Sequence, residues 1–182
     1  MLDCQIAILE NAIARYLSKN EIPGPMGSRH PSIAPFEAFK TKDSYIIIAA
    51  GNDKLFTKLC DVLKIPETAN DERFNSNSLR CENMDHLKEI FEKQLRSKST
   101  NEWVKEMEAL KIPCGPIFNI KQAVENPQIQ ERNMIVKSYH KIIGEFKSAG
   151  NPIKISTYKD ENTRGDIPDL DEHREKIIKE FS

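Results

Sequence analysis

The segment from Ile22 to Pro31 constrains the fold more than any other part of the chain. Three prolines and two glycines lie within nine of its residues, so neither helical nor strand hydrogen bonding continues through it. We therefore expect a loop here. Before it, apolar side chains recur at helical spacing over residues 3–19 and predict one amphipathic helix.

Two short apolar stretches after the loop predict a β-hairpin. They span residues 36–39 and 45–50 and flank a polar turn. Because the second stretch is apolar throughout, we expect it to be buried on both faces.

Three helices are expected after the hairpin. The first begins after Gly51-Asn52-Asp53, and a longer one covers about 77–97. The third follows Ser99-Thr100-Asn101-Glu102, which is a capping-box pattern. It carries Trp103, Met107 and Leu110, of which Trp103 and Met107 are expected to lie in the core.

The last third of the chain changes character after Ile112-Pro113-Cys114-Gly115-Pro116. Residues 120–132 predict a short helical stretch broken at Pro127. Strand-like segments follow at 134–139, 144–148 and 152–156, and a final helix is expected over 171–181.

Composition excludes several classes of partner. The 27 Lys and Arg residues balance 28 Asp and Glu residues, so no basic field favours nucleic acid or an anionic membrane. No apolar run approaches the roughly 18 residues of a membrane helix. The first residues lack a basic region typical of signal peptides, so we expect a cytoplasmic protein. Scattered cysteines and histidines favour reduced thiols and no metal site.

The segment Gly27-Ser28-Arg29-His30-Pro31 is the most suggestive for chemistry. Its glycine permits close backbone approach, and its arginine and histidine are suited to an anionic or carbonyl group. An ordinary exposed loop is the alternative, because most Pro- and Gly-rich loops do no chemistry.

Two other segments have a functional and a structural interpretation. Gly51-Asn52-Asp53 lies where a helix N-terminus could hold an anion, but helix capping is favoured because Asp53 would repel a phosphate. Cys114 invites a nucleophile interpretation, yet no basic partner is near it in sequence, which favours a small buried apolar residue.

Taken together, short motifs along nearly the whole chain resemble class III CoA-transferases, a family that includes formyl-CoA and carnitine CoA-transferases and α-methylacyl-CoA racemases. The motifs occur in the family's order: Leu2-Asp3-x-Gln5-x-Ala7-x-Leu9, Gly27-x-x-His30-Pro31, Phe39-x-Thr41-x-Asp43, Ala49-x-Gly51-Asn52-Asp53, Asp71-x-Arg73-Phe74, Asn77-x-x-Arg80, Ile112-Pro113-Cys114-Gly115-Pro116, Asn126-Pro127-Gln128 and Gly150-x-Pro152-Ile153-Lys154-x-Ser156.

The resemblance implies an α/β fold with an α+β small domain. A β-hairpin plus helices would be followed by strands and a terminal helix that in the family return to a Rossmann-like large domain. It implies three parts: a helix and active-site-covering loop over 1–39, the small domain over 40–120, and the returning C-terminal segment over 121–182.

The resemblance also implies a reaction and an absent nucleophile. Full-length members transfer CoA between an acyl-CoA and a carboxylic acid through an aspartyl-CoA intermediate, which is nucleophilic catalysis by a carboxylate. Their catalytic aspartate lies upstream of the Leu-Asp-x-Gln helix, so we assign no catalytic residue to this chain. Coenzyme A is expected as substrate, with no covalently bound cofactor.

By the same resemblance, the loop Gly27, Ser28, Arg29, His30 and Pro31 corresponds to the loop that covers the active site, and these residues are the candidate substrate-binding set. The chain departs from the family at three positions. Pro25 stands where many relatives have arginine, Ser28 where they have asparagine, and Asp171 where they have glycine.

Expected partners are the substrates, an N-terminal half or separate subunit, and further copies in a homo-oligomer. A stand-alone, non-catalytic binding or assembly module is the alternative. A hydrolase using Cys114 or His30 is a third hypothesis.

Overall fold

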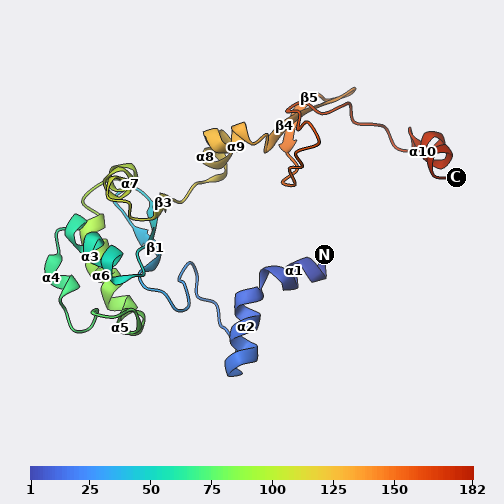
Figure 1. The fold of residues 1–182 in the computed structure, drawn as a ribbon. Coiled ribbons are helices and arrows are strands. Elements are labelled where there is room, and N and C mark those ends of the chain that lie inside the picture. The colour runs from blue at the N-terminus through green and yellow to red at the C-terminus, as the bar shows by residue number, and fades with distance from the viewer. The chain divides into compact units, whose positions relative to one another are not determined.

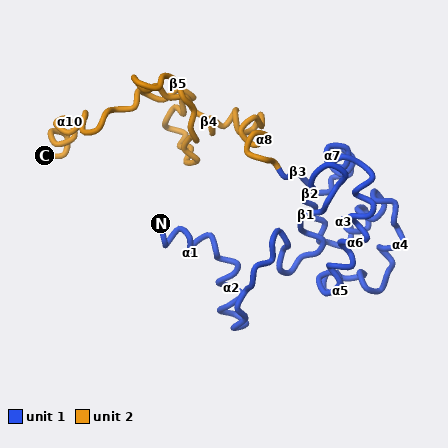
Figure 2. Tube along the Cα trace, turned by 180° about the vertical axis from the view of Figure 1, so that it is seen from behind, with its two compact units in different colours: residues 1–117 blue, residues 118–182 orange.

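A computed structural model describes residues 1–182, which form two compact units, Met1–Ile117 and Phe118–Ser182 (Figures 1 and 2). The mixture of helices with small antiparallel sheets confirms the α/β fold class. None of the helices is both long and apolar enough to cross a membrane.

The N-terminal residues form two helices where one was predicted. They are α1 (Leu2–Ile8) and α2 (Glu10–Lys19). The amide of Leu9 donates to Ile6 O at 3.1 Å, three residues back, which tightens the turn and breaks the helix there. Asn20 ends α2 in the left-handed conformation, with φ 53°. Neither helix buries a residue completely.

The predicted hairpin is confirmed and carries a third strand. Strands β1 (Phe36–Lys40), β2 (Tyr45–Ala49) and β3 (Cys114–Pro116) form an antiparallel sheet with β2 in the centre. In the register, Phe36 lies opposite Ala49 and Ile48 opposite Cys114. The prediction that β2 is buried on both faces was wrong. Its residues alternate, and Tyr45 is 46% exposed, because α6 and α7 pack on one side of the sheet.

Five helices complete the first unit: α3 (Asp53–Val62), α4 (Pro66–Ala69), α5 (Asn77–Glu82), α6 (Met84–Leu95) and α7 (Thr100–Ala109). The predicted helix over 77–97 is divided at Asn83, whose side chain donates to Arg73 O and Leu79 O. The Ser99–Glu102 capping box is confirmed.

The core of the first unit is almost the whole core of the chain. Its fully buried side chains include Phe39, Phe56, Phe74, Phe91, Leu87 and Met107. The burial of Trp103 and Met107 is confirmed. Leu110 caps the C-terminus of α7 and is 46% exposed, because the chain turns away at Lys111 with φ 58°.

The second unit contains α8 (Ile120–Glu125), α9 (Pro127–Glu131), the hairpin of β4 (Ile135–His140) and β5 (Gly144–Ala149), and α10 (Arg174–Phe181). The break at Pro127 is confirmed. The strand predicted at 152–156 was wrong. Instead Thr163 pairs with Lys137 of β4 in a parallel bridge, and Val136 is the one buried apolar residue of this unit.

Apolar side chains remain exposed outside the main core. In unit 1 they are concentrated on the first two helices, and in unit 2 they are spread over the hairpin turn, the 153–158 segment and α10: Leu2, Ile6, Ile8, Leu9, Tyr16, Leu17, Ile142, Ile143, Ile153, Ile155, Tyr158, Ile177, Ile178 and Phe181. Clusters of exposed apolar side chains often mark a contact with another protein surface.

Candidate functional site

The loop of residues 27–31 lies along the outer edge of β1. Gly27 has φ 62° and begins a turn closed by the amide of Arg29, which donates to Met26 O at 3.3 Å. The hydroxyl of Ser28 accepts from the Ala38 amide at 3.0 Å. The His30 amide donates to Phe36 O at 2.9 Å. The loop is therefore ordered by contacts with the sheet.

Arg29 carries the charge of this loop and contacts two carboxylates. Its Nε donates to Glu37 Oε1 at 2.8 Å, and one terminal nitrogen donates to Asp85 Oδ1 at 2.7 Å. Lys88 also donates to Glu37. The pKa of the Asp85 carboxyl is lowered because Arg29 donates a hydrogen bond to it and carries the opposite charge. The guanidinium thus joins the loop to β1 and α6.

A cavity of about 150 Å³ lies beneath the loop, lined by Met26, Arg29, His30, Pro31, Cys81 and Met84. The His30 ring stacks on Phe36, with centroids 5.3 Å apart. His30 Nδ1 accepts from the Ser32 amide at 3.2 Å, which leaves Nε2 as the ring nitrogen available to a ligand. Small polar molecules fit a space of this volume.

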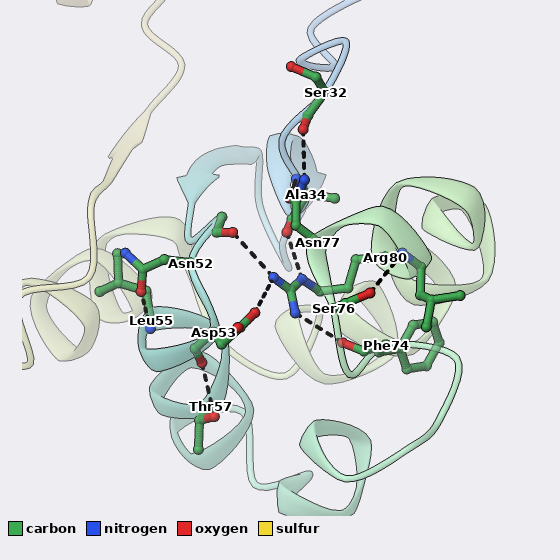
Figure 3. Close-up of polar contacts among 12 residues, drawn as sticks. Ser32, Ala34, Asn52, Asp53, Leu55, Thr57, Phe74, Ser76, Asn77 and Arg80 are labelled. Atoms are coloured by element: carbon green, nitrogen blue, oxygen red, sulfur yellow. Dashed lines mark hydrogen bonds and ion pairs between the residues drawn. The ribbon is translucent and has the colours of Figure 1, made fainter.

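The chain that follows the loop is fixed by a buried arginine. Arg80 is fully buried, and its guanidinium donates to Ala34 O at 2.9 Å, Phe74 O at 3.0 Å and Gly51 O at 3.2 Å (Figure 3). It also pairs with Asp53 at 2.8 Å. Arg80 therefore contacts three segments that are separate in sequence, at Ala34, at Gly51 and Asp53, and at Phe74.

Asn77 adds two hydrogen bonds to the same arrangement (Figure 3). Its side chain donates to Ser32 O at 2.8 Å and accepts from the Ala34 amide at 3.0 Å. Gly51 is equally constrained, because a Cβ there would lie 1.9 Å from Ile33 Cγ2. The motif residues around Gly51, Asn77 and Arg80 hold the base of the loop.

Helix capping is confirmed for Asn52, whose side chain accepts from the Leu55 amide at 2.9 Å. The Asp53 carboxylate pairs with Arg80, and the negative charge of Asp53 opposes anion binding at this helix N-terminus. This junction has a structural role.

The cysteines lack the surroundings of a nucleophile. Burial raises the pKa of Cys114, and its thiol contacts Val104 O at 4.0 Å. Burial raises the pKa of Cys60 to about 12. Both are protonated thiols at neutral pH, which removes the basis for a Cys114 hydrolase. No three His, Cys, Asp or Glu side chains are grouped so as to hold a metal ion.

In the second unit, Asp160 is contacted by Lys154 of the last sequence motif and by two residues outside that motif. Lys154 and Arg164 both donate to this carboxylate, the latter at 2.7 Å, and Asn133 Nδ2 donates to Asp160 O at 2.6 Å. A Cβ at Gly150 would lie 2.1 Å from Asn133 O. These contacts organise the segment after β5.

Sequence reasoning missed Glu37, Lys88 and Asp85 as partners of the loop. One signal was present, an acidic residue inside the apolar stretch 36–39. The partners of Glu37 are Lys88 and Arg29, which lie 51 and 8 residues away in sequence, so no local pattern reveals them.

Comparison with known proteins decides the family. The model of CoA-transferase family III matches residues 1–174. The chain belongs to CoA-transferase family III. The chain is 38% identical over 182 residues to an acetyl-CoA:oxalate CoA-transferase of Acetobacter aceti, covering 100% of this chain and 46% of the relative. It is 32% identical over 180 residues to a human succinyl-CoA:glutarate CoA-transferase, covering 99% of this chain and 41% of the relative.

A solved structure of the family has the same fold. A CAIB/BAIF family protein from Brucella suis superimposes with a TM-score of 0.76 at 32% identity, covering 99% of this chain and 46% of that one. The family III chain therefore spans less than half the length of these relatives and corresponds to their C-terminal half.

Proposed function

We propose that this chain is the C-terminal part of a class III CoA-transferase, which transfers CoA from an acyl-CoA to a carboxylic acid. One observation carries the proposal: the family match covers residues 1–174, while the relatives are about twice as long. The names of two relatives specify oxalate and glutarate, so we infer that the acceptor is a dicarboxylic acid.

In the proposed reaction, a catalytic aspartate outside this chain attacks the acyl-CoA and forms an acyl anhydride, releasing the CoA thiolate. The thiolate attacks the aspartyl carbonyl, which frees the donor acid and leaves aspartyl-CoA. The acceptor carboxylate attacks this thioester and forms a second anhydride, again releasing the thiolate. Attack of the thiolate on the acceptor's acyl carbon yields the new acyl-CoA and restores the aspartate.

In this proposal, residues Gly27 to Pro31 contact the substrate and exclude water from the anhydrides, which water would hydrolyse. The half-buried Arg29 and His30, together with the adjoining cavity, support a polar contact with the acid. We also infer the division into 1–39, 40–120 and 121–182, a cytoplasmic location, and CoA as substrate with no covalent cofactor.

The missing half of the enzyme is the proposed partner, either in the same polypeptide or as a separate subunit. The exposed apolar residues of α1 and α2 support this, since both helices lack any buried residue within this chain. Homo-oligomer formation by the complete enzyme is part of the same proposal.

The test is reconstitution with the N-terminal half of the Acetobacter aceti relative. The two chains are co-expressed, and CoA exchange is measured from acetyl-CoA to oxalate and from succinyl-CoA to glutarate. We expect exchange in the mixture and none with either chain alone. A stable complex without exchange for either pair would contradict the proposal and favour a non-catalytic assembly module.

A matched pair of variants controls the reconstitution. Leu17 is 76% exposed on α2, and Leu17→Glu is expected to abolish complex formation. Ser18→Glu introduces the same charge at the adjacent exposed position and should leave the complex intact. Equal loss of complex formation in both variants would mean that the apolar side chains of α2 do not form the contact.

A further inference from the structure

The outer edge of β1 has no neighbouring strand, yet its polar backbone groups are paired. Ala38 N donates to the Ser28 hydroxyl, and Phe36 O accepts from the His30 amide. Further along, Lys88 donates to Ala38 O at 2.8 Å, and Lys40 N donates to Glu92 Oε1 at 2.9 Å. The loop thus takes the place of a fourth strand over half of this edge.

A buried carboxylate lies beside these contacts. Glu37 is 3% exposed and accepts from the two cations Arg29 and Lys88. Lys88 also lies over the Phe39 ring, 5.4 Å from its centroid. A buried carboxylate is stable only with such partners, and two donors on its two oxygens satisfy it.

The two carboxylates on Arg29 differ in exposure. The Glu37 side chain is 4% exposed and that of Asp85 is 90% exposed. Ion pairs with an exposed partner contribute little, whereas removal of one partner from a buried pair is costly. Glu37 is therefore the stronger anchor for Arg29, and Arg29 is placed between Ser28 and His30, the two residues that bond to β1.

We propose that Glu37 is a positioning residue that, through Arg29, holds the loop of residues 27–31 on the outer edge of β1. Glu37 then sets the fraction of time for which the loop is docked. This inference rests on the proposed function only for its consequence, that docking limits the access of water to the reaction intermediates.

Hydrogen exchange of the full chain tests the docking directly. In Glu37→Gln, the amide offers one acceptor and one donor where two cationic donors converge. We expect exchange at the His30 and Ala38 amides to rise on the order of tenfold, with α7 unchanged. The matched control is Glu89→Gln on α6, an 82% exposed side chain, which should leave both amides as in the parent chain. Unchanged exchange in Glu37→Gln would overturn the proposal.

Two further variants keep the test decisive if Glu37→Gln does not fold. Arg29→Lys keeps the charge but loses the fork that reaches both carboxylates, so the same two amides should exchange faster. Asp85→Asn removes the exposed partner and should raise their exchange by a smaller factor. A larger effect from Asp85→Asn than from Arg29→Lys would contradict the role of Glu37 as the main anchor.

The reconstituted enzyme supplies a readout that a purely structural role would not change. Glu37→Gln is expected to raise the ratio of acyl-CoA hydrolysis to CoA transfer, since water reaches the intermediates when the loop is undocked. An unchanged ratio alongside faster exchange would overturn the consequence, that docking limits the access of water, while the docking of the loop by Glu37 would stand. If no variant or parent chain shows transfer but exchange responds as expected, the proposed function fails and the docking by Glu37 stands.

Discussion

A single buried guanidinium connects the loop base, the strand end and the segment before α5. Arg80 satisfies three backbone carbonyls and the Asp53 carboxylate, and it lies 4.6 Å from the centroid of the Phe56 ring. Its removal would leave buried acceptors without donors.

We expect Arg80→Ala to lower the free energy of unfolding by roughly 3 kcal/mol or more, because three backbone carbonyls in or near the core lose their donor at about 1–3 kcal/mol each. Urea denaturation provides the measurement. Arg96→Ala, on a 57% exposed side chain paired with Glu92, is the control and should change the value by about 0.5 kcal/mol or less. Similar losses of stability in both variants would show that the buried contacts of Arg80 contribute no more than an exposed ion pair.

Steric fit at Gly51 leads to a second prediction. Because its Cβ would overlap Ile33, Gly51→Ala should destabilise the chain by about 1–3 kcal/mol. Ile33→Ala in the same chain should recover most of that loss, which thermal unfolding of the single and double variants would reveal. Gly115→Ala, with no atom within 4 Å of its Cβ, is the control. Absence of recovery would point to backbone strain instead of overlap.

Titration of exposed carboxylates affects stability in acid. The pKa of Asp71 is lowered to about 2, mainly because Arg73 donates to its side chain, against an ordinary value of 3.8. Since the folded pKa is the lower one, this contribution is present above pH 4 and disappears as pH falls towards 2. We expect Asp71→Asn to show a shallower loss of stability than the parent chain between about pH 4 and pH 2. Parallel curves in that window would refute this.

At the scale of elements, caps determine where helices begin. The Ser99 hydroxyl accepts from Glu102 N at 3.4 Å, and Glu102 accepts from Ser99 N at 2.9 Å. Ser99→Ala should lower the free energy of unfolding by about 1 kcal/mol, as measured by chemical denaturation. Asn101→Ala, two residues further along the helix, should lower it by less. An equal cost for the two would mean that the cap contributes nothing measurable.

Local patterns predicted the elements that have local causes. The loop, the hairpin, the capping box and the break at Pro127 follow from residues close in sequence. The predictions that failed depend on distant packing. Whether β2 is covered on both faces depends on which helices pack against the sheet. The segment 152–156 forms no strand, and Thr163 pairs with β4 instead.

The same distinction applies to the candidate site. Gly27 to Pro31 stood out because its glycine permits close backbone approach and its arginine and histidine suit an anionic or carbonyl group. The contacts of the Glu37 carboxylate and the Arg80 guanidinium join residues far apart in sequence. The sequence therefore placed Arg80 in a motif and Glu37 in a predicted strand without revealing what either side chain contacts.

At the scale of the whole chain, stability is unevenly distributed. Nearly all buried apolar residues lie between Ala34 and Ile112, and Val136 is the one buried apolar residue of the second unit. We expect unfolding in two steps, with residues 118–182 opening at lower urea concentration. Limited proteolysis should leave a resistant fragment that contains residues 34–117. A single cooperative transition seen by all probes would contradict this.

The pairing of the β1 edge by side chains has a consequence for solution behaviour. A free strand edge is a template for strands of other molecules, and proteins avoid aggregation by covering such edges. Here the cover is the same loop that is proposed to open over the substrate. In that proposal each opening frees Phe36 O and Ala38 N on the edge of β1, so a variant whose loop stays undocked is expected to self-associate by intermolecular β-pairing.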